Sequence, residues 1–249
     1  MERRRMRRFR QIGIIAAILL LPPLAFIGWN QATYNFAILQ PGRIYRSGQM
    51  SATALSRTIR EHQIKTVLNL RGPNLGESWY RDEIAATLAS GATQVDLSLS
   101  SCVWMSRIQL RALVRMLDTC DHPLIMHCAW GSERTGLASA ITELLRPGGT
   151  LASARDQLVL RHLYVRLGDG KIMAEFVDQY ADWLRRNRLE HRPEVFRRWV
   201  AEGYVPGKPS REAWPYDPAP LVVVTHPRAS SGRLARREVR AGSSETRAR

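Results

Sequence analysis

Residues 127–136 carry the side chains with the clearest chemical potential in this sequence, and they read His-Cys-Ala-Trp-Gly-Ser-Glu-Arg-Thr-Gly. An ionised Cys128 thiol would be a strong nucleophile. Arg134 carries a planar guanidinium that can hold two oxygens of one oxyanion. Because only five residues separate the two side chains, a tight turn would place both against the same small anion.

The flanking sequence predicts a strand before this segment and a helix after it. Residues 123–127 form a short apolar run, and residues 135–145 have the composition of a helix that ends before Pro147. A loop between a strand and a helix N-terminus aims backbone N–H groups and the positive end of the helix dipole at one point. This field would stabilise an anion without a metal ion, and it would lower the pKa of the Cys128 thiol.

Several loop residues suit this role. Gly131 can adopt the positive φ that turns N–H groups inward in a tight loop. Thr135 can donate its hydroxyl to the sulfur and so ease the departure of a thiolate, and Gly136 permits close packing of the helix on the loop. Arg134 would bind the charge of a transition state better than that of the ground state.

Strand-like and helix-like segments alternate through the rest of the domain. Runs with β-rich or alternating apolar residues predict strands at 44–46, 65–70 and 92–99. Apolar residues three or four apart predict helices at 51–62, 77–90 and 106–118. This order is typical of an α/β fold with a mostly parallel central sheet flanked by helices. Extra C-terminal helices are expected at 151–160, 172–187 and 193–201.

The loop segment resembles the His-Cys-x5-Arg-Thr-Gly signature of the protein tyrosine and dual-specificity phosphatase superfamily. Residues 42–49 and 64–71 also resemble bacterial dual-specificity-like members, and the similarity runs from about Gly42 to Leu145. The resemblance implies a cysteine-phosphatase-like fold that hydrolyses phosphomonoesters without a cofactor. Protein phosphotyrosine, with or without phosphoserine and phosphothreonine, is then the default substrate.

The resemblance also implies the roles of the site residues. Cys128 would attack phosphorus to form a phosphocysteine, which water then hydrolyses. His127 would be a buried residue that hydrogen-bonds the loop backbone. The phosphoryl oxygens would be held by the Arg134 side chain and by the backbone N–H groups of the loop, from Ala129, Trp130, Gly131, Ser132, Glu133 and Arg134.

The general acid is the least defined part of this scheme. The family uses an Asp on a loop upstream of the nucleophile, and Asp96 lies 32 residues before Cys128. However, Asp96 falls inside a predicted strand and could equally be a structural carboxylate. Glu133 could orient water or pair with an arginine, and Glu77 and Asp82 are more remote candidates. A missing acid costs about 10²- to 10⁴-fold in rate.

The basic charge of the chain sits mainly at its two ends. The net charge is +15, of which residues 1–10 and 206–249 contribute +5 each. The central part is therefore not expected to bind nucleic acid.

Arg46 and Arg71 could form a basic rim or be surface residues in salt bridges, and Trp130 could pack at the rim or form a wall for an aromatic substrate. The three cysteines match no zinc pattern, so no metal is expected.

The N-terminal segment predicts a membrane anchor. Residues 3–10 hold six arginines, and an apolar run follows from Ile12 to Trp29. As a helix, this run would span about 27 Å, close to the hydrocarbon thickness of a bilayer. A single-pass anchor with a cytoplasmic N-terminus is expected from the positive-inside rule. A cleaved signal peptide and a buried soluble helix are the alternatives.

Three regions and three functions follow from these patterns. Residues 1–40 would be the basic N-terminus and anchor, 41–205 the phosphatase domain with a helical extension, and 206–249 a disordered tail in which Leu221 to Val224 could still dock on the domain. The first functional alternative is a weakly active or inactive phosphoprotein-binding module. A rhodanese-like sulfur transferase also uses a loop cysteine, but it would not explain Arg134, Thr135 and Gly136 at the start of a helix.

Overall fold

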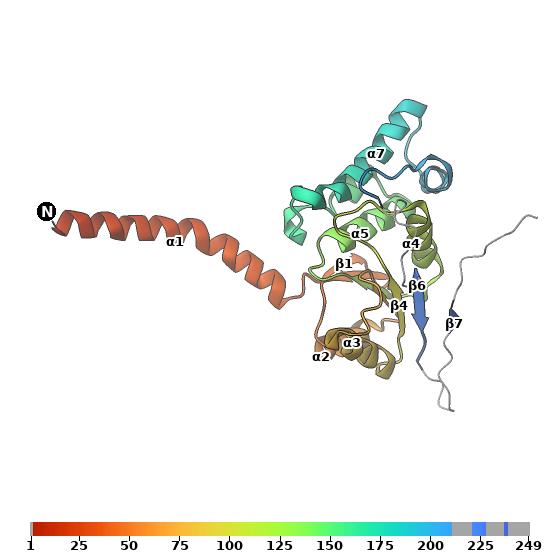
Figure 1. Ribbon diagram of the computed structural model, residues 1–249, viewed down its shortest axis with the longest axis horizontal. Coiled ribbons are helices and arrows are strands. Elements are labelled where there is room, and N and C mark those ends of the chain that lie inside the picture. The colour runs from red at the N-terminus through yellow and green to blue at the C-terminus, as the bar shows by residue number, and fades with distance from the viewer. Residues whose placement is uncertain (1, 211–220, 228–236, 239–249) are drawn as a thin grey trace, which may run out of the picture.

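The computed structural model describes the fold of residues 2–210, 221–227 and 237–238. Figure 1 shows a central sheet with helices on both faces and one long helix that projects from the domain. Seven strands form the sheet in the order β1-β2-β5-β3-β4-β6-β7. Their bounds are β1 Ala37–Gln40, β2 Ile44–Ser47, β3 Thr66–Asn69, β4 Thr93–Leu97, β5 Leu124–His127, β6 Val222–Thr225 and β7 Arg237–Glu238.

The parallel strands bring their C-terminal ends to one edge of the sheet. Strands β2, β5, β3 and β4 are mutually parallel, whereas β1 and β6 pair antiparallel at either side. Ser47, His127, Asn69 and Asp96 lie in one row across the four parallel strands. Ligands of open α/β sheets bind beyond this edge, and the loop that follows His127 begins there.

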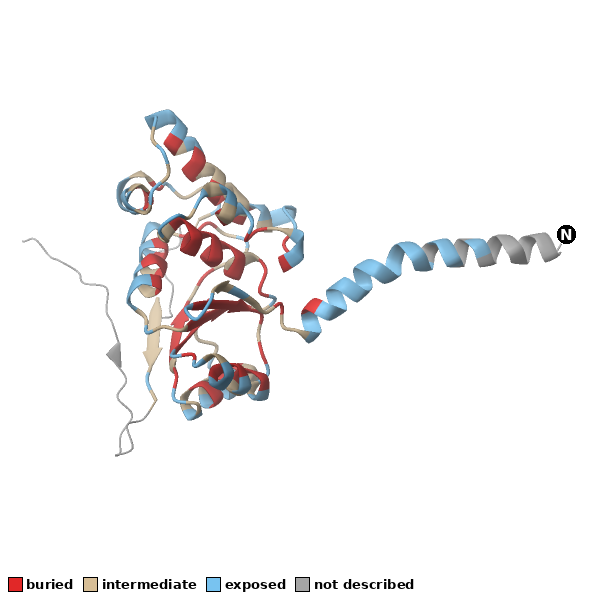
Figure 2. Ribbon diagram, turned by 180° about the vertical axis from the view of Figure 1, so that it is seen from behind, coloured by how far each residue is buried: buried red, intermediate tan, exposed pale blue. Residues whose placement is uncertain are grey.

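Helices cover both faces of the sheet, which confirms the predicted α/β fold. Helices α2 (Ala52–His62) and α3 (Ser78–Ala89) lie on one face, and α4 (Arg107–Thr119) and α5 (Glu133–Leu145) lie on the other (Figure 1). Ser51 caps α2, and Ser106 forms a capping box with Gln109 at the start of α4. The inner strands and α5 form the most buried part of the molecule (Figure 2).

The C-terminal helices pack against the side of α5 that faces away from the sheet. They are α6 (Leu151–Arg155), α7 (Ile172–Asn187) and α8 (Pro193–Arg198). Aromatic rings from α7, α8 and the turn that follows α8 pack together: Phe176, Tyr180, Phe196, Trp199 and Tyr204. They belong to the same core as Leu137 and Ile141 of α5. This packing on α5 fixes the helix whose first turn carries Arg134.

Helix α1 (Glu2–Ala32) corrects the expectation of a membrane anchor. Among the described residues, the structure contains no helix with enough length and apolar character to span a bilayer. The helix contains Pro22 and Pro23 within its apolar run. The predicted single-pass anchor at Ile12–Trp29 is therefore wrong. The membrane location and the cytoplasmic N-terminus were inferred from that anchor and no longer follow.

Part of the tail adds a strand to the sheet. Strand β6 pairs with β4 along its whole length, with Val223 opposite Asp96 and Val222 opposite Leu97. The alternative expectation that Leu221 to Val224 dock on the domain is thus observed for Val222–Thr225. These four β-branched residues favour an extended strand, and the edge of β4 supplies unpaired backbone groups for it to bind. The rest of the predicted disordered tail, at 211–220, 228–236 and 239–249, lies outside the described residues.

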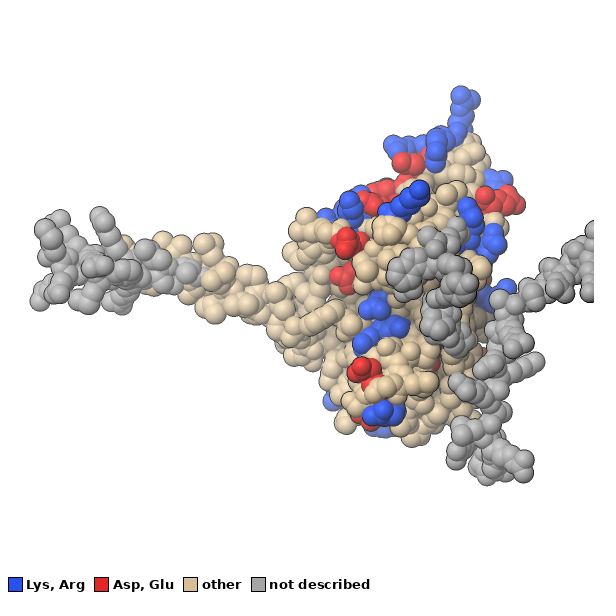
Figure 3. Space-filling view, viewed as in Figure 1, with Lys and Arg blue, Asp and Glu red and all other residues tan. Residues whose placement is uncertain are grey.

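The charged side chains of the domain are mixed in sign. In Figure 3, Lys and Arg lie mainly over the helical upper half of the face in view, interspersed with Asp and Glu. Several acidic residues of the described part of the chain form ion pairs, including Asp178 with Arg155 and Arg166. The described part of this face therefore presents alternating charges.

Candidate active site

The loop between β5 and α5 is tightly fixed by its backbone. Gly131 has φ +68°, and a Cβ at this position would lie only 2.7 Å from the backbone nitrogen of Gly48. The backbone N–H of Gln49 donates to the carbonyl of Ala129 at 3.0 Å. Gly131 is therefore needed both for its conformation and for the close approach of the β2–α2 connection.

Cys128 lies at the base of this loop and is almost fully buried. Burial by itself opposes ionisation of the thiol. The hydroxyl of Thr135, the charge of Arg134 and the backbone N–H groups of Thr135 and Gly131 outweigh it and hold the pKa of Cys128 below its ordinary value. Cys128, Arg134 and Thr135 therefore interact with one another in this loop, and their interactions favour the thiolate form of Cys128.

Arg134 and Ser132 present polar atoms that suit a bound oxyanion. Arg134 Nη1 donates to the carbonyl of Leu99 at 3.5 Å, which is a weak contact. Arg134 Nε and Ser132 Oγ are buried and have no hydrogen-bond partner among the described residues. Buried donors normally have partners, so both atoms fit a site in which an anion completes their hydrogen bonding.

Arg46 supports the loop by a hydrogen bond to its backbone, a role that the sequence did not predict. It is 1% exposed, and its guanidinium donates to the carbonyl of Gly131 at 2.7 Å and to Gln157. Burial lowers the pKa of Arg46 to about 9, the nearby Cys128 works against this shift, and Arg161 adds to it. Arg46 therefore stays charged at neutral pH and adds a positive charge beneath the thiolate. It forms no salt bridge among the described residues, contrary to one of the two expectations for it.

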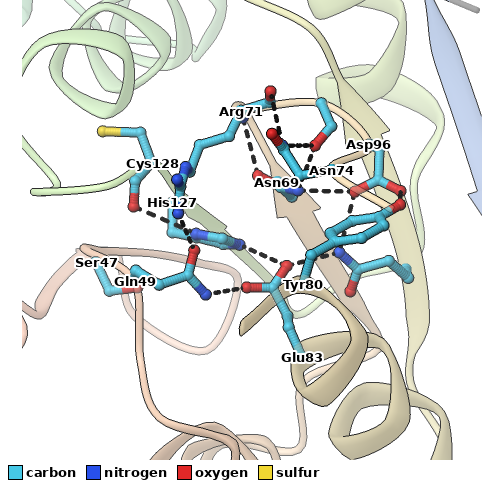
Figure 4. Close-up of polar contacts among 12 residues, drawn as sticks. Ser47, Gln49, Asn69, Arg71, Asn74, Tyr80, Glu83, Asp96, His127 and Cys128 are labelled. Atoms are coloured by element: carbon cyan, nitrogen blue, oxygen red, sulfur yellow. Dashed lines mark hydrogen bonds and ion pairs between the residues drawn. The ribbon is translucent and has the colours of Figure 1, made fainter. Parts of the chain in front are cut away.

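His127 belongs to a buried ion pair. Its Nε2 lies 3.2 Å from Glu83 Oε1, and its Nδ1 lies 3.4 Å from the carbonyl oxygen of Cys128 (Figure 4). Burial opposes the charge on both side chains, but their mutual attraction wins. The pKa of His127 is raised and that of Glu83 is lowered. A protonated His127 donates from both nitrogens, so it ties the loop backbone to α3.

Glu83 collects further hydrogen bonds that no sequence signal marked. It accepts from the side-chain amide of Gln49, and from Gln94 Nε2 at 2.8 Å. Glu83 comes from α3, Gln49 from the β2–α2 connection and Gln94 from β4. Only the fold brings these residues together beneath His127, because they are far apart in the chain.

Asp96 lies in this buried network and not at the loop. Its carboxylate accepts from Tyr80 at 2.6 Å, from Asn69 at 2.9 Å and from Gln94 at 3.2 Å. Burial raises the pKa of Asp96, which these hydrogen bonds only partly offset. In the row of paired residues, Asn69 stands between Asp96 and His127, and Figure 4 shows Asp96 on the far side of Asn69 from Cys128. The structure therefore does not bring Asp96 to Cys128, and we assign Asp96 to the buried network.

The other carboxylates do not replace it at the expected place. The segment between β4 and α4, residues 98–106, touches the site through Leu99 but contains no Asp or Glu. Glu133 begins α5, and its side chain packs against Gly170, where an added Cβ would lie 3.4 Å from Glu133 Cγ. Glu77 and Asp82 are exposed on or beside α3. The described residues contain no cluster of side chains that could hold a metal ion.

Two aromatic residues and an arginine lie at the rim of the site formed by the loop between β5 and α5. Trp130 is 58% exposed, so it is not packed into the core. The guanidinium of Arg71 stacks on the Trp79 ring, with its Cζ 3.6 Å from the centroid. Arg71 Nη1 also donates to Gln49 Oε1 at 3.0 Å. Arg71 is therefore held at the rim by an aromatic face and an amide.

Comparison with known proteins matches part of the chain to a phosphatase family. The family model described as the tyrosine phosphatase family covers a segment that includes strands β1–β5 and the loop. Residues 28–146 match the tyrosine phosphatase family. The resemblance drawn from residues 127–136 is thereby confirmed, and the match supports a phosphatase. A search of curated proteins finds no match to the chain.

Solved structures of phosphatases are similar at low identity. TpbA of P. aeruginosa in complex with pTyr is 19% identical, with a TM-score of 0.47 over 58% of this chain and 83% of that one. The core catalytic domain of the PP-IP phosphatase SIW14 of S. cerevisiae is 21% identical, with a TM-score of 0.45 over 62% and 93%. PTPMT1 in complex with PI(5)P is 12% identical, with a TM-score of 0.41 over 59% and 97%. At such identities the substrates of these proteins do not carry over.

Proposed function

We propose that the protein is a cysteine-dependent phosphatase that hydrolyses phosphomonoesters through a phosphocysteine intermediate. The observation that carries the proposal is the Cys128 thiol, whose pKa is held down beside Arg134 at the start of α5. A thiolate next to a guanidinium and inward N–H groups is suited to attack on a bound phosphate. The family match over residues 28–146 supports the same reaction class.

The reaction would proceed in two displacements. The Cys128 sulfur attacks phosphorus, the S–P bond forms, and the bond from phosphorus to the leaving oxygen breaks. Water then attacks phosphorus, the S–P bond breaks, and inorganic phosphate leaves as the thiolate is regenerated. Arg134 and the loop N–H groups hold the other phosphoryl oxygens in both steps. Thr135, which hydrogen-bonds the sulfur, stabilises the thiolate as it departs.

The segment 98–106 without an acid favours aryl over alkyl esters as substrates. A tyrosine phenolate departs with a pKa of about 10, so it can leave without a proton. Serine and threonine alkoxides are far more basic, closer to the pKa of ~16 of bulk water. Unassisted departure of an alkoxide would therefore be much slower. We propose protein phosphotyrosine as the principal substrate, with phosphoserine and phosphothreonine hydrolysed more slowly.

Hydrolysis of 4-nitrophenyl phosphate by the full chain and by Cys128→Ser tests the reaction class. Turnover by the wild type, loss in the variant and a phosphorylated Cys128 in acid-quenched wild type are the expected results. Phosphotyrosine and phosphoserine forms of one peptide then test the preference. Wild-type turnover that survives Cys128→Ser would show that another group is the nucleophile.

A phosphoprotein-binding module is the second candidate, and the same acid-free segment favours it. Its signature would be no wild-type turnover of any aryl phosphate combined with retained binding of a phosphotyrosine peptide. Isothermal titration with the phosphorylated and unphosphorylated peptide separates this outcome from an inactive, non-binding protein.

A further inference from the structure

Arg71 is a charged residue beside the loop whose guanidinium is held in place by its neighbours. It follows the C-terminal end of β3, which pairs with β5, the strand that leads into the loop. Stacking on Trp79 and the hydrogen bond to Gln49 fix its guanidinium. The backbone of Gln49 is itself bonded to Ala129 of the loop. The guanidinium is thus positioned relative to the loop and does not sweep freely through solvent.

The charge of Arg71 is not neutralised by a salt bridge. None of the ion pairs among the described residues includes it. Partial burial lowers the pKa of Arg71, and the positive charge of Arg134 lowers it further, while Glu83, Cys128 and Glu77 act in the opposite direction. Arg71 therefore stands close enough to Arg134 and Cys128 to share their electrostatic field.

Most of the donors of Arg71 are still available. A guanidinium has five N–H donors, and the described contacts of Arg71 use one of them, for Gln49. The scissile phosphate already has Arg134 and the loop N–H groups, with Arg46 adding charge from below. The loop itself contains no Lys to bind a second anion. A guanidinium held rigidly at the rim can donate two parallel hydrogen bonds to a planar or tetrahedral oxyanion outside the loop.

We propose that Arg71 determines specificity by binding a second anionic group, a phosphate or a carboxylate, on the leaving group of the substrate. This inference rests on the proposed phosphatase function, because it concerns the part of the substrate that leaves the loop. Trp79 acts as a positioning residue that holds the Arg71 fork by a cation–π contact. The second anion lies away from the reacting phosphorus, so it contributes equally to ground-state and transition-state binding, and the effect belongs in KM and not in kcat.

Matched aryl phosphates test this with the full chain. One pair is 3-carbamoylphenyl phosphate and 3-carboxyphenyl phosphate, and the other is 3-hydroxyphenyl phosphate and benzene-1,3-diyl bisphosphate. The wild type is expected to favour the charged member of at least one pair by about tenfold in kcat/KM, through KM. Arg71→Gln should abolish the preference, because kcat/KM should fall more for the charged member of a pair than for the neutral member. Trp79→Leu should reduce the preference, and Arg71→Lys should restore part of it. The preference should also fall as salt is raised, since the site is half-exposed.

Arg115→Gln is the matched control, because it removes the same charge from an exposed position on α4. Its preference should equal that of the wild type, and melting temperatures verify that all variants are folded. No preference in the wild type, or equal loss for both members of each pair in Arg71→Gln, would overturn the inference. In the latter case Arg71 serves the scissile phosphate. Both results leave the proposed function intact, whereas absence of turnover for every phosphate removes both proposals.

Discussion

At the scale of single residues, Cys128 depends on partners from several elements. Thr135 and Arg134 come from α5, Arg46 comes from β2, and Glu83 acts from α3 through His127. Positive charge and hydrogen-bond donors thus surround one buried sulfur. Burial alone would favour the neutral thiol, and the interactions with Thr135, Arg134 and Gly131 outweigh it and keep the pKa low.

We expect Glu83→Gln to shift the activity profile to higher pH. Without the carboxylate, the pKa of His127 falls and its positive charge next to Cys128 is lost. Because that charge and the Cys128 thiolate stabilise each other, the pKa of the thiol must then rise. The thiolate fraction on the acid side falls, and the acid limb of kcat/KM against pH moves upward. A pH profile with 4-nitrophenyl phosphate measures this.

Glu61→Gln, on the exposed surface of α2, is the control for Glu83→Gln and should leave the profile unchanged. Thermal melts of both variants are required, since removal of one partner of a buried pair costs about 3–5 kcal/mol in comparable cases. An unchanged acid limb in folded Glu83→Gln would mean that His127 does not act on the thiol through its charge.

Asp96→Asn should behave as a structural change. The carboxylate is buried among Tyr80, Asn69 and Gln94, so the variant should lose stability. We expect kcat/KM for a phosphotyrosine peptide to fall by less than about tenfold, against the 10²- to 10⁴-fold typical of a lost general acid. The basic limb of the pH profile should stay in place. Loss of that limb with a large fall in kcat would restore Asp96 as the acid.

At the scale of elements, the junction of β5 with α5 creates the site. The strand ends at His127, and the helix begins at Glu133, so the loop between them lies at the helix N-terminus. Gly131 allows the loop to turn where the β2–α2 connection passes within van der Waals distance. The local sequence therefore specifies a loop shape, and the neighbouring connection clamps it.

Gly131→Ala should damage both the fold of the loop and the reaction. The left-handed φ strains any residue with a Cβ, by about 1–3 kcal/mol, and the added carbon would clash with Gly48. The matched control is Gly148→Ala, which has φ +74° but nothing within 4 Å of the new carbon. Both variants should lose stability, whereas only Gly131→Ala should lose most of kcat/KM. Equal activity of the two variants would show that the loop tolerates the displacement.

At the scale of the whole molecule, the sheet is completed by the tail. Strand β6 covers the edge of β4 that would otherwise expose unpaired backbone groups. The site lies on the other strands, at the ends of β5 and β3. The tail strand should therefore matter for stability and aggregation more than for turnover.

Two truncations test this division. Removal of residues 211–249 deletes β6 and should lower the melting temperature by several degrees, since about 1 kcal/mol corresponds to roughly 2–4 °C in a domain of this size. Removal of residues 228–249 retains β6 and should have a smaller effect. Both should keep kcat/KM for 4-nitrophenyl phosphate within about twofold. A large loss of turnover in the shorter chain would instead connect β6 to the site.

The sequence by itself determined which residues we propose as nucleophile and phosphate clamp and which local elements carry them, because the strand, the loop and the first helical turn are contiguous in residues 123–136. Periodicity also gave the α/β order of the domain. Tertiary structure decided what surrounds them. Arg46 contacts the loop from β2, Glu83 acts through His127, and Arg71 is held beside the loop by Gln49. Asp96 lies in a buried network despite its suitable spacing, and Val222–Thr225 pairs with β4 from far along the chain. Contacts between distant segments depend on which faces and edges pack together, and that information is not local to any stretch of residues.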